Sequence, residues 1–258
     1  MIKKNKFQIG KDLKVEKFIY GITEEIWENK KINSIYDYYD KNVIVRSPRK
    51  TTYKCSDVIN STKDTLSQFP NRQLIGEDVI WSGDNKNGIL SSHRILSTAT
   101  HKGNGFYGKS TGKNIIYRVI ADCFIIDNMV VEEWIVRDES AILNQLGFTP
   151  KKFVGMKIKE KIFDKCSVNS ISNAFNYKNV IKNNSNEYTK TYISYFKKLI
   201  NKDFNLIKKN YERSAQTFWP GGKINYSHTQ IENIWTNFLN CFENLELIIH
   251  FFSGITEP

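Results

Sequence analysis

The spacing of apolar residues changes along this chain from a helical period to a strand period. Near the N-terminus apolar side chains recur at steps of three and four, as they do on one face of a helix: Val15, Phe18, Ile19, Ile22, Ile26 and Trp27. A second short helix is predicted at 32–39 and a strand at 43–46, before Pro48. Ser56 is the expected N-cap of a further helix that continues to Phe69.

From residue 72 onward the apolar period is two, which is typical of strands with two different faces. We predict four strands, separated by short turns rich in Gly, Asn and Asp: 72–82, 88–101, 114–126 and 129–137. Such short turns join antiparallel neighbours, so the pattern indicates an α+β fold in which a curved, mainly antiparallel sheet wraps over helices. A short helix at 141–146 closes the unit at Gly147.

The early part of this pattern recurs near the C-terminus. The segment 39–48 reads YDKNVIVRSP and 211–220 reads YERSAQTFWP, while IWSG at 80–83 corresponds to FFSG at 251–254. The sequence therefore predicts a complete domain at 1–148, a Lys- and Asn-rich linker at 149–186 and an incomplete second copy at 187–258. Because half a sheet leaves an open edge, we expect that copy to be marginally ordered alone or to dock on the first domain or on another chain.

Composition narrows the class of protein. Hydrophobic residues make up 40% of the 258, enough for a substantial core, and no apolar run is long enough to predict a membrane helix. The net charge of +11 comes from 31 Lys and only 7 Arg, without Arg clusters among aromatics, which argues against nucleic-acid binding. No secretory signal is recognisable, and Cys55, Cys123, Cys166 and Cys241 have no metal-site spacing, so we expect reduced thiols and a cytoplasmic protein.

Candidate chemistry concentrates in two of the predicted strands. The stretch 91–103 reads SSHRILSTATHKG and carries two of the four histidines, His93 and His101. On the next strand Arg118 and Asp122 share a face with large apolar residues. Such surroundings would desolvate Asp122 and raise its pKa toward that of a general acid or base. His93 or His101 would assist it, and Arg118 would hold an anionic oxygen.

Aromatic residues are candidates for the walls of a substrate pocket. Trp81 and Tyr107 could flank an aromatic ligand, and Trp134 is a further candidate. Trp134 lies on the opposite face of its strand from Glu133 and Arg137, so a role in the core is the alternative for it.

Purely structural roles are also compatible with the polar residues of these strands. Arg118 and Asp122 could form structural ion pairs with neighbouring strands, and His101 could be a solvated residue at a strand end.

Specific motifs resemble those of SnoaL-like polyketide cyclases, in the nuclear transport factor 2-like superfamily. They are THKG followed by TGK between two strands, the acid-bearing IADCF, then VVEEW and a terminal QLG, within a resemblance that covers residues 12–147. The resemblance implies a cone-shaped α+β fold, a pocket between sheet and helices, and homodimerisation through the sheet. It also implies an aspartate that catalyses aldol ring closure without metal or cofactor, and Asp122 stands where the family carries its acid.

Two functional hypotheses follow. The first is a cofactor-free acid/base cyclase or isomerase that acts on a small hydrophobic carbonyl compound. The alternative is a non-catalytic ligand-binding or dimerisation module, because one scaffold serves many functions. Neither hypothesis requires a metal ion, a nucleic acid or a membrane as partner.

Overall fold

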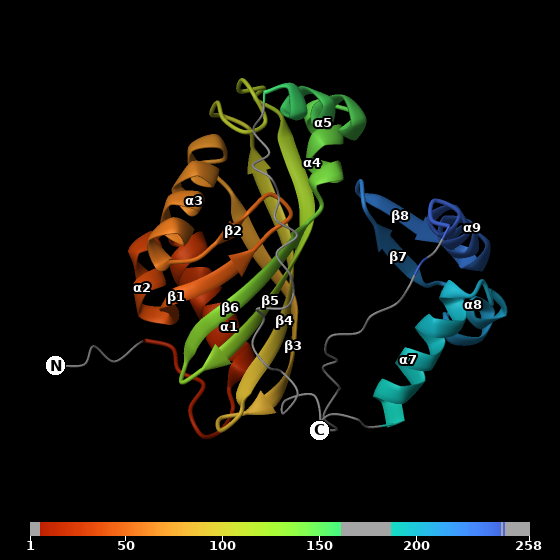
Figure 1. The fold of residues 1–258 in the computed structure, drawn as a ribbon, viewed down its shortest axis with the longest axis horizontal. Helices are drawn as coiled ribbons and strands as arrows, with labels where there is room; N and C mark the ends of the chain where they lie inside the picture. The colour runs from red at the N-terminus through yellow and green to blue at the C-terminus, as the bar shows by residue number, and fades with distance from the viewer. Residues whose placement is uncertain (1–5, 161–186, 244, 246–258) are drawn as a thin grey trace.

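The computed structural model describes residues 6–160, 187–243 and 245 (Figure 1). A helical layer precedes the long strands, and its members are α1 (Val15–Thr23), a π-helical turn (Glu24–Glu28), a 3₁₀ turn (Ile32–Ser34), α2 (Ile35–Tyr38) and α3 (Cys55–Gln68). The apolar stripe predicted for the first helix is confirmed, since five of its six residues are buried and Trp27 packs against the same core.

The main sheet has six strands, and they are β1 (Tyr39–Arg46), β2 (Thr51–Thr52), β3 (Gln73–Asp84), β4 (Gly88–Thr100), β5 (Asn114–Ile126) and β6 (Met129–Arg137). Their order is β2-β1-β6-β5-β4-β3, and all neighbours are antiparallel except β1 and β6. The predicted meander is therefore confirmed. The parallel pairing of β1 with β6, between segments far apart in the sequence, was not predicted.

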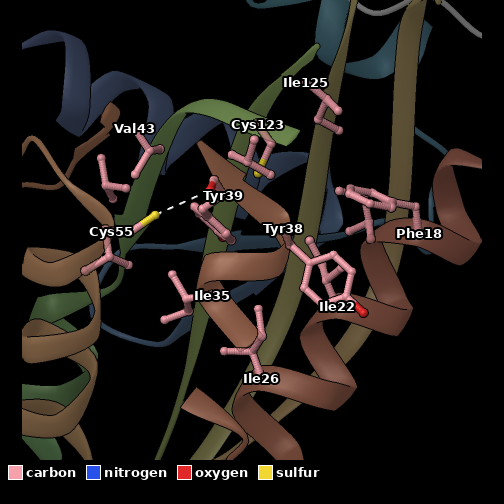
Figure 2. Close-up of a cluster of buried hydrophobic side chains, with 14 of the residues drawn as sticks. Phe18, Ile22, Ile26, Ile35, Tyr38, Tyr39, Val43, Cys55, Cys123 and Ile125 are labelled. Carbon is pink, nitrogen blue, oxygen red and sulfur yellow. Dashed lines mark hydrogen bonds between the residues drawn. The ribbon is translucent and has the colours of Figure 1, made fainter. Parts of the chain in front are cut away.

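The start of α3 corrects the sequence-based prediction of its cap. The helix begins at Cys55 after Lys54, and no side chain caps its first turn, so Ser56 is not the N-cap. The Cys55 thiol instead donates to the carbonyl oxygen of Tyr39 at 3.3 Å (Figure 2). It also lies 3.1 Å from the carbonyl oxygen of Asp40. This contact ties α3 to the beginning of β1, which a local capping rule could not anticipate.

Strand register determines which side chains meet on the helix-facing side of the sheet. His93 of β4 pairs with Ala121 of β5, which in turn pairs with Ile135 of β6. In the next row toward α1, Cys123 pairs with Glu133. Odd-numbered residues of β4 and β5 therefore share this face with Glu133, Ile135 and Arg137 of β6.

Two large clusters of buried residues lie along the helix-facing side of the sheet, and a smaller one around Leu90 and Phe124 lies on the other face. One large cluster packs α1 and α2 against β1 and the nearer ends of β3–β6, and it includes Phe18, Ile22 and Tyr39 (Figure 2). The other large cluster packs β4 and β5 against α4 (Glu139–Leu146) and α5 (Pro150–Lys159), with Tyr107 and Tyr117 among its members.

The C-terminal unit has its own small core and touches the first domain. It consists of α7 (Glu187–Ile200), α8 (Asn205–Asn210), β7 (Gln216–Trp219), β8 (Lys223–Tyr226) and α9 (Ser227–Leu239). Its central apolar residues are Leu199, Ile207 and Ile231. At the hairpin turn the backbone N–H groups of Gly221 and Gly222 donate to the Asp138 carboxylate at 2.9 and 3.0 Å. Among the described helices, none has the length and apolarity needed to cross a membrane.

Two glycines near the end of the first domain test how backbone conformation contributes to its stability. Gly147 adopts φ +94° as the left-handed C-cap, whereas Gly155 lies inside α5 with nothing within 4 Å of an added Cβ. We expect Gly147→Ala to lower the free energy of unfolding by about 1–2 kcal/mol, because an L-residue is strained there. The matched change Gly155→Ala should be neutral or stabilising by up to about 1 kcal/mol. Urea unfolding would measure both, and equal effects at the two sites would contradict this account.

Candidate active site

A cavity of about 610 Å³ lies between the concave face of the sheet and helices α1 and α3. Its walls are largely apolar, and the contributing residues include Ile19, Ile22, Val45, Val58, Leu74, Ile95, Val119 and Ile135. The exposed lining residues mark its mouth, at the β1–β2 turn, α3 and the β4–β5 loop: Lys50, Asp64, Ser67, Asn104 and Gly105. Polar side chains of α3, among them Thr62, Thr65 and Gln68, also line it. Small-molecule sites combine apolar walls with converging polar groups in this way.

Glu133 is the carboxylic acid of the buried cavity wall. It is 4% exposed, and its partners are the Tyr39 hydroxyl, which donates to Oε2 at 3.4 Å, and the Cys123 thiol, 3.9 Å from Oε1. Burial raises the pKa of Glu133 to about 7, and these hydrogen bonds lower it only in part. Near neutral pH this group can therefore both accept and donate a proton.

His93 lies on the same face, two strands away from Glu133. It lines the cavity, is 2% exposed, and its Nε2 atom has no hydrogen-bond partner among the described residues. Its ring stands edge-on to Tyr20, with 5.3 Å between ring centroids. Burial lowers the pKa of His93 to about 4, although the charge of Asp78 opposes this, so the imidazole is neutral at physiological pH.

Three arginines, Arg49, Arg72 and Arg137, line the cavity at the end away from Glu133. Arg137, on β6, lies four residues beyond Glu133, and Arg72 lies just before β3. Burial lowers the pKa of the Arg72 guanidinium; Tyr117 partly offsets this, and the positive charge of Arg137 adds to it. Both groups remain charged, because an arginine does not lose its proton in a protein.

The sequence-based position of Asp122 inside the pocket is wrong. Asp122 pairs with Ser92 and Trp134, so it belongs to the even-numbered set that faces away from the cavity, and it does not line the pocket. The expected desolvation is confirmed, since burial raises the pKa of Asp122. The error was one of register: His93 and Asp122 were assigned to a common pocket, but they lie on opposite faces of the sheet.

Arg118 also faces away from the cavity. Its guanidinium makes a bidentate pair with Glu77, at 2.9 and 2.8 Å, and Arg94 approaches the same carboxylate at 3.3 Å. Arg118 thus pairs with Glu77 of β3, in line with the structural interpretation of its sequence position.

His101 and Tyr107 pack together beside the cavity and are not part of its wall. His101 is fully buried, stacks near Phe69 with centroids 5.2 Å apart, and its Nδ1 lies 3.2 Å from the Thr111 hydroxyl. It is therefore not a solvated turn residue. Tyr107 is also buried, and its hydroxyl donates to Glu139, while its neighbour Phe106 lines the cavity.

The two predicted tryptophan platforms do not line the cavity. The Trp81 indole N–H donates to Glu16 at 2.7 Å, and the ring packs against the edge of the core cluster that contains Phe18, Ile22 and Tyr39. Trp134 lies on the outer face, with the Arg46 guanidinium 5.9 Å from its ring. A tryptophan does line the cavity, namely Trp27, whose ring stands 6.2 Å from that of Tyr39.

Sequence reasoning placed Glu133 and Arg137 on one face but did not assign them to the site. The sequence shows that both lie on one face of β6, opposite Trp134, but whether that face meets the cavity depends on the register between strands. Arg72 had no such signal, since it precedes the strand. In the part of the chain that the structure describes, no three His, Cys, Asp or Glu side chains gather in a way that could hold a metal ion. Cys55, Cys123 and Cys241 are free thiols, and Cys166 lies outside the described residues.

The fold and cavity agree with a comparison against protein families. The model of the SnoaL-like polyketide cyclases matches residues 17–146, just over half of the 258-residue chain. The chain belongs to this family. The match spans α1 to α4, so it includes the cavity described above and stops before the C-terminal unit.

Several solved structures are similar to about half of the chain. AclR, a candidate hydroxylase from Streptomyces galilaeus, is 20% identical, and the match covers 51% of this chain and 94% of AclR at a TM-score of 0.45. IdmH, a candidate polyketide cyclase from Streptomyces antibioticus, is 17% identical over 52% of this chain and 99% of IdmH, with a TM-score of 0.46. A candidate polyketide cyclase from Acidithiobacillus ferrooxidans is 20% identical over 54% and 97% of the two chains, with a TM-score of 0.46. A search of curated proteins finds no match.

The buried carboxyl of this SnoaL-like domain predicts a specific dependence of stability on pH. The pKa of Glu133 is raised from 4.5 to about 7 in the folded state, so folding favours the protonated form. Stability is then lost as pH rises from about 4.5 to about 7, by on the order of 3 kcal/mol. Urea unfolding across this range should show the loss in the wild type relative to Glu133→Gln, where it is absent. A difference that does not vary with pH would contradict the assignment.

His93 provides a control with the opposite sign. Its folded pKa of about 4 lies below the ordinary value of 6.5, so folding disfavours protonation. Relative to His93→Gln, the wild type should lose on the order of 3 kcal/mol as pH falls from about 6.5 to about 4. The same unfolding series measures both variants.

Proposed function

We propose that this chain is a cofactor-free acid/base enzyme of cyclase or isomerase type, with Glu133 as its general acid/base. The substrate is a small, hydrophobic carbonyl compound that enters the cavity from the α3 side. The observation that carries the proposal is a protonatable carboxyl on the wall of a largely apolar cavity, with a pKa of about 7. Membership of the SnoaL-like family supports the reaction class.

The chemistry follows from the position of this acid. Ionised Glu133 removes a proton from the carbon next to a carbonyl group, so that a C–H bond breaks, an O–H bond forms and an enolate results. In a cyclisation the enolate carbon attacks a second carbonyl of the same molecule, and the resulting alkoxide takes the proton back from Glu133. In an isomerisation the proton returns to another carbon. Neither route consumes a cofactor.

The surroundings of Glu133 hold it ready for either proton transfer. The Tyr39 hydroxyl fixes one carboxyl oxygen, and Cys123 contacts the other. Neutral His93 supplies a polar surface on the same face, where it can hydrogen-bond without adding charge. The apolar walls exclude water and so strengthen these interactions during the reaction.

Catalysis can be tested with a probe that reports enolisation. We expect the wild type to accelerate exchange of the α-protons of 2-tetralone for deuterium, followed by NMR in D₂O near neutral pH. Glu133→Gln should reduce the exchange rate by about 10²–10⁴-fold, because the proton acceptor is lost.

Asp122→Asn is the matched control, since it changes a second carboxyl whose pKa burial also raises, on the opposite face of the sheet. We expect it to retain exchange within about twofold. Loss of exchange in Asp122→Asn alone would restore the sequence-based assignment and remove Glu133. Tight binding of 2-tetralone without exchange in the wild type would favour the alternative function, a non-catalytic binding module.

We also propose that residues 187–258 are an incomplete second SnoaL-like copy. The order helix, helix, strand, strand, helix in 187–239 repeats the order of α1, α2, β1, β2 and α3, and this supports the proposal together with the sequence repeats. The hydrogen bonds from the hairpin turn to Asp138 favour docking on the first domain. An experimental structure in which the backbone of 187–239 does not superpose on that of 15–68 would contradict it.

The oligomeric state and location are further proposals. We propose a cytoplasmic homodimer formed through the sheet, on the strength of the family resemblance. Light scattering that returns the 30.1 kDa mass of one chain would contradict the dimer.

A further inference from the structure

The cavity has two chemically different ends. Glu133 lies at the end next to the core cluster that contains Phe18 and Tyr39. Arg137 and Arg72 lie at the other end, next to the cluster that contains Tyr107 and Tyr117. Glu133 and Arg137 are four residues apart on the same strand, which corresponds to about 13 Å between their backbone positions. A ligand that contacts both must therefore be elongated.

The surface of the sheet between the two ends is apolar, and the α3 side of the cavity opposite it carries neutral polar side chains such as Thr62, Thr65 and Gln68. Ile135 lies between Glu133 and Arg137 on β6, and Val119 and Ile95 continue this surface across β5 and β4. These three neighbouring positions of the sheet are all aliphatic. The body of the ligand between its two polar ends is therefore expected to be hydrocarbon-like, such as fused rings.

The arginine end has more positive charge than nearby carboxylates can neutralise. Arg137 has one carboxylate within 4.0 Å among the described residues, that of Glu139 at 3.8 Å, which is shared with Arg49 at 3.7 Å. In the described part of the chain Arg72 makes no ion pair at all within that distance, although it is 7% exposed. Three guanidinium groups, those of Arg49, Arg72 and Arg137, therefore line this end with one distant, shared counter-charge.

A hydrogen-bond donor is also left over at this end. The Nε atom of Arg137 is buried and has no partner in the described structure. A buried, unpaired donor is costly, and a planar oxyanion is the acceptor that matches the geometry of a guanidinium group.

We propose that the cavity binds an elongated, apolar carbonyl compound that carries a carboxylate, with the carboxylate at Arg72 and Arg137 and the reacting carbon at Glu133. The second half of this assignment rests on the proposed function, whereas the arginine site stands on its own contacts. The carboxylate anchors the molecule in one orientation, which places its far end at the acid.

The arginine site can be tested by equilibrium binding without any turnover. The probes are naphthalene-2-carboxylate and naphthalene-2-carboxamide, which have the same shape and differ in charge. Titration calorimetry at about pH 6 keeps the carboxylate ionised and Glu133 largely protonated. We expect the carboxylate to bind the wild type at least about tenfold more tightly than the carboxamide.

Three variants show which residues produce the preference for the carboxylate probe. Arg137→Met and Arg72→Met should each remove most of it, whereas Arg94→Met, which deletes an equal charge from the outer face, should leave it intact. Equal affinity of the wild type for the two probes would overturn the proposal, even if neither arginine variant folds. A preference that survives in both folded arginine variants would overturn it as well.

The same probes separate this inference from the catalytic one. Glu133→Gln should keep the preference for the carboxylate, because the backbone positions of Glu133 and Arg137 are about 13 Å apart along the strand. If deuterium exchange is absent but the preference is present, the ligand class stands and catalysis does not. If exchange is present but the preference is absent, catalysis stands and the ligand class does not.

Discussion

The burial of the Glu133 carboxyl is the interaction on which the rest of this site depends. A carboxylate removed from water is costly unless it is hydrogen-bonded or protonated, and here the compensation is partial. The Tyr39 hydroxyl and the Cys123 thiol contact it, but neither brings a positive charge. The Glu133 carboxyl is therefore partly protonated near neutral pH. The same incomplete compensation that destabilises the charged form makes the group useful in acid/base chemistry.

Tyr39 also connects this acid to the framework of the fold. Tyr39 is the first residue of β1, and its carbonyl oxygen accepts a hydrogen bond from Cys55 at the start of α3 (Figure 2). Its ring packs near that of Trp27. The parallel pairing of β1 with β6 brings Tyr39 and Glu133 together. The pairing of β1 with β6 therefore joins β1 to the sheet and also positions the acid.

The two faces of the sheet divide the charged residues between different tasks. On the outer face Glu77 is paired with Arg118 and Arg94, and Glu132 lies 2.7 Å from Arg46. These pairs satisfy each other and hold neighbouring strands together. On the cavity face Arg72 and Arg137 keep little counter-charge, and Glu133 has none among the described residues. Charges left unneutralised inside a cavity are more readily explained by a ligand than by the stability of the fold.

The sequence by itself determined the elements, the antiparallel meander and the family, because apolar spacing and turn residues are local signals. It also determined that Asp122 is desolvated, since its strand neighbours are large and apolar. Only the tertiary structure decided which face of each strand meets the cavity. That choice depends on register between strands, and a shift of one residue exchanges the two faces. The acid on the cavity wall is therefore Glu133 and not Asp122, because His93 pairs with Ala121.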